Sequence, residues 1–167
     1  FSGPTRISIS GQHVVVSGLK FDGATNTSGD RGIVEFRQGT STFARNARLT
    51  QSVFLNCNPP PSAPGEPHDP SIRYHWVTLY GQDNRVDHCH FEGHNHSGVT
   101  LVVWVGPVPD RHRIDHNHFA GRIEAPNREN GWETIRVGTS DVSLNSSQTI
   151  VERNLFTNCD GEIEVIS

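Results

Sequence analysis

Five segments of the chain share one hydrophobic pattern, in which an aliphatic residue is followed five positions later by phenylalanine. The phenylalanines are separated by 33, 37, 28 and 37 residues, and glycine or asparagine stands two residues after each of them. A unit that returns at a variable interval indicates stacked structural repeats joined by loops of different length. The segments span residues 16–21, 49–54, 86–91, 114–119 and 151–156, and the glycine or asparagine positions are Gly23, Asn56, Gly93, Gly121 and Asn158.

Each unit is followed by a short segment in which apolar and polar residues alternate, which is the period of a β-strand. No stretch shows the sustained period of an amphipathic helix. A repeated strand, corner, strand and loop predicts an all-β right-handed parallel β-helix of about five coils. A β-sandwich is the alternative, but it gives no reason for one phenylalanine and one corner in every unit. The alternating segments lie at 32–36, 76–80, 99–104, 134–137 and 163–166.

Length and composition fit a single domain of the globular class. The chain has 167 residues, a net charge of −4 and a mean hydropathy of −0.51. It contains no apolar run long enough for a membrane span, and its scattered basic residues do not form a nucleic-acid footprint. We expect no membrane or nucleic-acid partner. Because methionine is absent and Phe1 opens directly into a strand-like segment, we expect residues 1–167 to be one β-helix domain truncated at both ends.

Three cysteines are too few for a disulfide scaffold. Cys57 and Cys159 each stand three residues after a repeat phenylalanine, and Cys89 stands two residues before one. All three therefore follow the packing period, which predicts buried free thiols.

Two glutamates near the C-terminal end of the sequence have the spacing of side chains on one face of a strand. If the aliphatic residues at positions 163 and 165 face the core, Glu162 and Glu164 both project outward. By the same alternation Arg136 faces outward one coil earlier, and Asn130 lies in the loop that leads to it. Two carboxylates and an amide oxygen are hard donors of the kind that suits calcium. A solvated glutamate pair with no ligand is the alternative reading of this spacing.

Histidines recur at one place in successive units, in DHCH at 87–90 and DHNH at 115–118. A His-x-His pair beside a carboxylate can bind zinc or act as acid or base. Equivalent positions on stacked coils also form ladders, and we favour this structural role for the two His-x-His pairs. His94 and His96 lie beyond a corner, where we expect them to be exposed and to contact a substrate.

Two C-terminal segments, NGWETIRVGTS at 130–140 and VERNLFTNCDGEIEVIS at 151–167, resemble polysaccharide lyase family 6, which contains alginate lyases and chondroitinase B. RVDHCHF at 85–91 and RIDHNHF at 113–119 are similar to the same family. The resemblance implies a parallel β-helix that cleaves an acidic polysaccharide by β-elimination, with calcium as cofactor.

The resemblance also implies roles for particular residues. Asn130, Glu162 and Glu164 match the calcium ligands of the family, and Arg136 matches a residue that lines the substrate cleft. The catalytic lysine and its arginine partner would lie beyond Ser167, so no catalytic residue is assigned within this chain. Family members often carry lysine near the position of His94, where this sequence differs.

We therefore expect a secreted or periplasmic lyase that acts on an anionic polysaccharide, with alginate of the poly-mannuronate type as the favoured substrate. A dermatan sulfate or chondroitin lyase is the alternative within the same class. A β-helix that binds polysaccharide without cleaving it, or a purely structural solenoid, is the alternative from another class.

Overall fold

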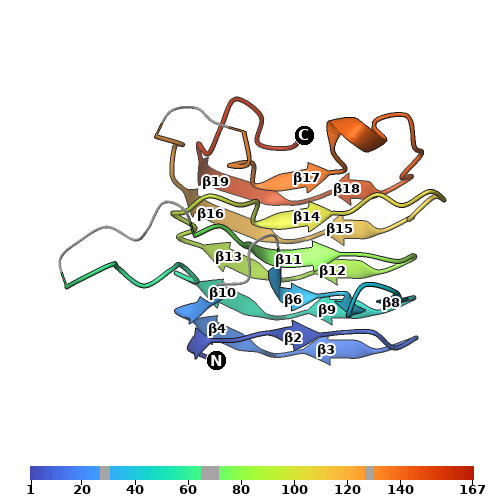
Figure 1. Ribbon diagram of the computed structural model, residues 1–167, viewed down its shortest axis with the longest axis horizontal. Coiled ribbons are helices and arrows are strands. Elements are labelled where there is room, and N and C mark those ends of the chain that lie inside the picture. The colour runs from blue at the N-terminus through green and yellow to red at the C-terminus, as the bar shows by residue number, and fades with distance from the viewer. Residues whose placement is uncertain (27–30, 65–71, 127–129) are drawn as a thin grey trace.

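The computed structural model describes residues 1–26, 31–64, 72–126 and 130–167. Three parallel sheets of five strands each run along the molecule (Figure 1). In spatial order the first sheet contains β17 (Ile135–Val137), β14 (Leu101–Val103), β11 (His75–Leu79), β6 (Gly32–Glu35) and β2 (Ile7–Ser8). The second contains β18 (Ile150–Glu152), β15 (Arg113–Asp115), β12 (Arg85–Asp87), β9 (Arg48–Thr50) and β3 (Val15–Ser17). The third contains β19 (Leu155–Cys159), β16 (His118–Arg122), β13 (His90–Glu92), β10 (Val53–Leu55) and β4 (Lys20–Asp22).

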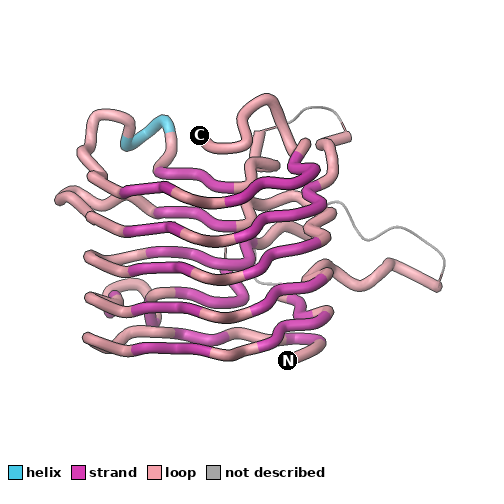
Figure 2. Tube along the Cα trace, turned by 180° about the vertical axis from the view of Figure 1, so that it is seen from behind, coloured by secondary structure: helices cyan, strands magenta, loops and turns pink. Residues whose placement is uncertain are grey.

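Each coil visits the three sheets in turn, and its strands pair with those of the coils on either side (Figure 2). The predicted all-β parallel β-helix of about five coils is confirmed. Small elements complete it: β1 (Gly3–Pro4) pairs with β5 (Ala24–Thr25), β7 (Arg37–Gln38) with β8 (Thr42–Phe43), and η1 (Ser140–Val142) is a short 3-10 helix. Within the described residues, no helix is long and apolar enough to cross a membrane.

The repeat phenylalanines form a continuous column inside the third sheet, which we call the phenylalanine ladder. Neighbouring rings are nearly parallel, with centroids 4.4 to 5.3 Å apart. The aliphatic residue of each repeat lies in the second sheet. Each of the five repeat segments therefore contains two strands with a bend between them. The ladder consists of Phe21, Phe54, Phe91, Phe119 and Phe156.

The bends are made by residues with left-handed backbone conformation, at three fixed positions in every coil. Besides the predicted corner two residues after each phenylalanine, left-handed residues stand eight and three residues before it. In the coil of Phe91 they are Asp83 (φ 58°), His88 (φ 51°) and Gly93 (φ 79°). All eleven described non-glycine residues with positive φ occupy these positions. A strained conformation that recurs at fixed intervals is imposed by the strand pairing on both sides of it.

Ion pairs connect successive coils on the outer face of the second sheet, and we call this set the charged ladder. Arg48 Nε donates to Asp87 Oδ1 over 2.7 Å, and Arg85 Nε donates to Asp115 Oδ1 over 2.8 Å. Arg113 Nη2 donates in the same way to Glu152 Oε1 over 2.6 Å. The Asp87 and Asp115 side chains are fully buried, and each is paired with the guanidinium group of an arginine from the preceding coil.

The predicted strand at 163–166 is wrong. Glu162 and Ile163 lie in a bend, and only Ile166 pairs with the first sheet, through a bridge to Ile135. The expectation that residue 163 faces the core is also wrong, since Ile163 is 83% exposed, whereas Val165 does pack against the core. The prediction of three buried free thiols is confirmed, and burial raises the pKa of Cys57 to about 12.

Candidate functional site

Four of the sequence-predicted site residues line one cavity of about 540 Å³ beside the last coil. Asn130 and Arg136 enter it from the loop before β17 and from β17 itself, and Glu162 and Glu164 enter from the segment after β19. The two groups are more than 20 positions apart in sequence, and the stacking of the coils brings them together. Arg73, Trp104 and Glu133 are among the other residues that line this cavity.

Glu162 is held in place by the backbone of the loop that contains Asn130. Its Oε2 accepts hydrogen bonds from the N–H groups of Gly131, over 3.0 Å, and of Trp132, over 2.9 Å. Both bonds use one oxygen, and among the described residues no hydrogen bond engages Glu162 Oε1. The preceding Gly161 lies so close to the Trp132 carbonyl oxygen that a Cβ there would be 1.9 Å from it. Only glycine allows this approach, which sets the position of Glu162.

Arg136 and Glu133 form a buried pair at the base of the cavity. Arg136 Nη1 lies 3.6 Å from Glu133 Oε1, which also accepts a hydrogen bond from the Ser167 hydroxyl over 3.2 Å. Arg136 is 9% exposed and its guanidinium carbon lies 5.9 Å from the centre of the Trp104 ring. Within the described structure, Glu133 Oε2 and Arg136 Nε are buried without a hydrogen-bond partner. Such atoms at the wall of a cavity are suited to a polar ligand.

The donor chemistry of this cavity fits a calcium ion. Asn130 supplies an amide oxygen, and Glu162 and Glu164 supply carboxylates, all of which are hard donors. The described residues contain no group of three His, Cys, Asp or Glu side chains arranged for a metal. The candidate ligand set consists of two carboxylates and one amide.

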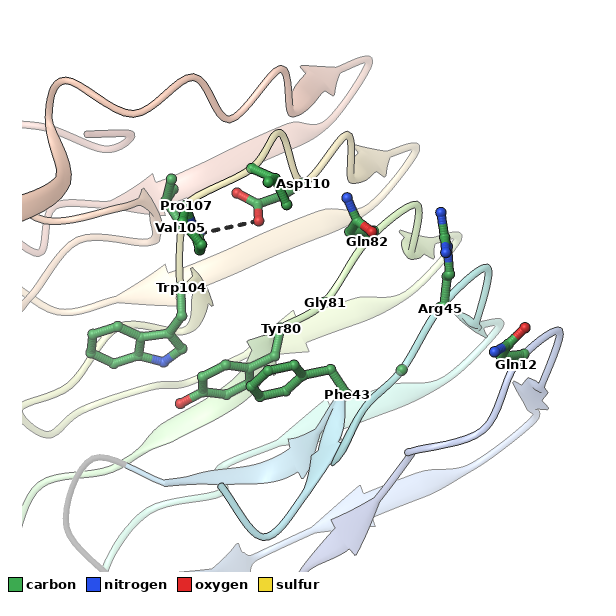
Figure 3. A pocket seen from close by; sticks show the side chains of 13 residues that line it. Gln12, Phe43, Arg45, Tyr80, Gly81, Gln82, Trp104, Val105, Pro107 and Asp110 are labelled. Atoms are coloured by element: carbon green, nitrogen blue, oxygen red, sulfur yellow. Dashed lines mark hydrogen bonds between the residues drawn. The ribbon is translucent and has the colours of Figure 1, made fainter. Parts of the chain in front are cut away.

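A second cavity of about 560 Å³ lies next to the first and shares Trp104 with it (Figure 3). Phe43, Tyr80 and Trp104 form a row across successive coils, with ring centroids 5.9 and 6.2 Å apart and nearly parallel planes. Arg37 lies 4.0 Å over the Tyr80 ring, and Arg45 stands farther along the same wall. The rings give this wall an apolar character, and Arg45 and Asp110 add one charged group of each sign to the cavity lining.

His94 and His96 do not line either cavity, and the prediction that they are exposed is wrong. They are 2% and 0% exposed. The His94 ring stacks on Trp76 with centroids 4.7 Å apart, and its Nδ1 lies 2.7 Å from Thr100 Oγ1. His96 packs on Tyr74 with centroids 4.2 Å apart. Both rings are part of the core, so neither offers a surface to a substrate.

Arg122 explains this burial and was missed by sequence reasoning. It donates to the carbonyl oxygens of His96 over 2.7 Å, of Gly98 over 2.9 Å and of Trp132 over 3.0 Å. Burial lowers its pKa to about 9, partly offset by the charges of Glu133, Cys159 and Glu162. One guanidinium thus ties the segment 94–98 to the loop that positions Glu162. Its bonds are to carbonyl groups distant in sequence, which leave no local signal.

A family model described as Chondroitinase B matches residues 1–167. This chain belongs to the chondroitinase B family. No curated protein matches it. Among solved structures, a mannuronic acid specific polysaccharide family 6 lyase from human gut microbiota is 36% identical to it, with a TM-score of 0.87. That match covers 99% of this chain and 36% of the other.

Two further solved structures that are similar to this chondroitinase B family chain are alginate lyases. The family 6 alginate lyase AlyGC is 36% identical with a TM-score of 0.87, and the match covers 99% of this chain and 22% of AlyGC. The alginate lyase AlyF-OU02, solved in complex with G6, is 26% identical with a TM-score of 0.81, over 99% of this chain and 34% of that one. The chain thus spans about a third or less of these structures.

Proposed function

We propose that this chain carries the calcium site and part of the substrate groove of a polyuronate lyase, with alginate of the poly-mannuronate type as substrate. The observation that carries the proposal is the meeting of Asn130, Arg136, Glu162 and Glu164 in one cavity. Membership of a family whose solved relatives are named as alginate lyases supports the substrate class. A polymeric substrate of this kind is consistent with a secreted or periplasmic enzyme.

Calcium bound by Asn130, Glu162 and Glu164 would neutralise the substrate carboxylate, which makes removal of the adjacent C5 proton easier. Glu162 is oriented for this role by two backbone N–H groups. Arg136, whose Nε faces no acceptor, adds a second positive group for the uronate carboxylate. Glu133 holds the guanidinium in place from behind.

The sugar chain would continue from Arg136 past Trp104 into the second cavity. Trp104 lines both cavities, so a single extended ligand can occupy them together. The apolar faces of sugar rings suit the aromatic row, and Arg45, whose Nε lies 3.8 Å from Asp83 Oδ2, would contact a uronate carboxylate at the far end of the cavity. The base and acid that move the proton are proposed to lie outside these 167 residues, as the family resemblance implies.

Calcium titration tests the metal part of the proposal. Chelator-treated protein should bind Ca²⁺ by isothermal calorimetry, and Glu162→Gln or Glu164→Gln should each weaken the binding by roughly tenfold or more, since each removes an anionic ligand. Asp141→Asn is the matched control, because Asp141 is an exposed carboxylate of η1 that lies outside the cavity lining. Equal affinity in all four proteins would refute the assignment.

Activity tests the substrate part. An intact lyase that contains this chain together with the base and acid should form unsaturated uronate, followed by its ultraviolet absorbance, from poly-mannuronate faster than from poly-guluronate or dermatan sulfate. A chelator should stop the reaction and added Ca²⁺ should restore it. Preference for dermatan sulfate would favour the chondroitinase alternative. Sugar binding without product formation would favour a binding module.

A further inference from the structure

The two histidine ladders on neighbouring coils differ in the direction of their ring nitrogens. His90 and His118 are register partners in β13 and β16. Their Nδ1 atoms face each other over 3.1 Å, with the rings tilted by 53°. Both side chains are partly exposed on the outer face of the third sheet. The two Nδ1 atoms therefore meet at a partly exposed position on this face of the sheet.

The outer nitrogens of this pair are already held. His90 Nε2 lies 2.7 Å from Glu92 Oε2, and His118 Nε2 lies 3.0 Å from Thr157 Oγ1. A carboxylate at Nε2 fixes the Nε2–H tautomer of His90, which leaves the Nδ1 lone pair directed at His118. Metal-binding histidines commonly have such a partner on the second nitrogen, because it orients the ring and makes the ligand more basic.

The other pair, His88 and His116, lacks this convergence. Its rings are parallel within 1° at a centroid distance of 5.1 Å. Each Nδ1 is bonded to the preceding aspartate, over 2.7 Å to Asp87 and 2.6 Å to Asp115. These rings belong to the charged ladder, so the ladder role predicted for the histidines describes this pair.

We infer that His90 and His118 form a binding site for a divalent transition-metal ion such as Cu²⁺, Ni²⁺ or Zn²⁺. Two metal–nitrogen bonds of about 2.0–2.1 Å across a 3.1 Å gap enclose an angle of about 100°, between octahedral and tetrahedral values. In the metal-free protein one Nδ1–H donates to the other Nδ1. When the metal takes both Nδ1 lone pairs, His118 changes to its Nε2–H tautomer and Nε2 donates to Thr157 Oγ1, so both rings stay neutral and no proton is lost.

The remaining ligands of the ion are water. Along the same row of the sheet the pair is flanked by Val53 and Leu155, which offer no donor. Imidazole nitrogen favours copper, nickel and zinc over calcium, and affinity rises toward Cu²⁺. The site is therefore chemically distinct from the oxygen donors of the calcium cavity. A bound ion would join β13 to β16 and so stabilise two adjacent coils against separation.

Copper binding to tag-free, chelator-treated protein tests the inference directly. One Cu²⁺ per chain should bind and show nitrogen hyperfine splitting from two imidazoles in its electron paramagnetic resonance spectrum, with a rise in Tm. His90→Gln and His118→Gln should each remove the two-nitrogen signal and the rise in Tm. Glu92→Gln should weaken binding by roughly tenfold.

His88→Gln is the matched control, since it removes an imidazole two residues away without touching the converging pair, and it should keep the signal. Glu162→Gln should keep it as well, which separates this site from the calcium proposal. Circular dichroism verifies that each variant is folded. A two-nitrogen signal that survives both His90→Gln and His118→Gln, a signal equally lost in His88→Gln, or no binding at equimolar copper would each overturn the inference.

Discussion

The phenylalanine ladder and the charged ladder run along the same stack of coils but depend on different forces. Phe91 is 1% exposed and contacts a ring above and a ring below, so its contribution is burial and ring stacking. Asp87 is equally covered, but it needs Arg48 from the neighbouring coil to be stable there. Because the strands pair in parallel register, equivalent positions of successive coils form a column of side chains with the same chemical character. An apolar column tolerates changes of pH, and a charged one does not.

Truncation of the phenylalanine ladder should give the largest effect. Phe91→Ala leaves a cavity between Phe54 and Phe119 and should lower the free energy of unfolding by about 3–5 kcal/mol, measured by urea denaturation. Phe43→Ala is the control, because Phe43 is 44% exposed. A loss in Phe91→Ala no greater than in Phe43→Ala would contradict a core role for the ladder.

Neutralising one carboxylate of the charged ladder should have a smaller effect. Asp87→Asn keeps the shape but removes the charge that Arg48 and His88 contact, which should cost about 2 kcal/mol. Asp22→Asn is the control, since its ion pair with Lys20 is exposed and should matter by at most about 0.5 kcal/mol. If the two variants are equally stable, the charged ladder does not hold the coils together.

Lowering the pH should weaken the charged ladder but not the phenylalanine ladder. Burial alone would raise the pKa of Asp115, but hydrogen bonds from Arg85 and His116 and the charges of Arg85 and Arg113 outweigh it and lower the pKa to about 2. A pKa below the unfolded value of about 4 means that the stabilisation is present above pH 4 and is lost as the pH falls toward 2. The stability gap between wild type and Asp115→Asn should therefore close over that range, as denaturation at several pH values can measure. A gap that stays constant to pH 2 would argue against an ionised, paired Asp115.

The smallest effect on stability should come from the candidate site, which belongs to neither ladder. Glu164 is exposed, so Glu164→Gln should change the free energy of unfolding by less than about 0.5 kcal/mol in calcium-free buffer. Thermal denaturation with a chelator measures this. A large loss would mean that Glu164 supports the fold, and its effect on calcium binding would then need another explanation.

Much of the fold could be predicted because the phenylalanines mark every coil. The corner after each of them was also visible, since glycine and asparagine adopt left-handed conformations easily. The two other corners in each coil were not visible. Residues such as His88, Arg111 and Gln148 occupy them, and these residue types give no comparable signal.

The site was predicted in part. Alternation and family resemblance selected Asn130, Arg136, Glu162 and Glu164, and the structure brings these four into one cavity. Alternation failed next to them, because the close approach at Gly161 turns the chain and leaves Ile163 exposed. Reading His94 and His96 as an exposed loop failed for a related reason, since a long-range partner, Arg122, draws the segment inward.

The three left-handed corners fix the length of one arc of every coil. From the first corner to the third, each coil uses the same ten-residue step, for example from Asp83 to Gly93. All variation in repeat length therefore falls on the arc that carries the first sheet, and the loops at 104–110 and 130–134 that border the two cavities lie there. Loops in that arc can therefore be lengthened or exchanged without changing the register of the other two sheets.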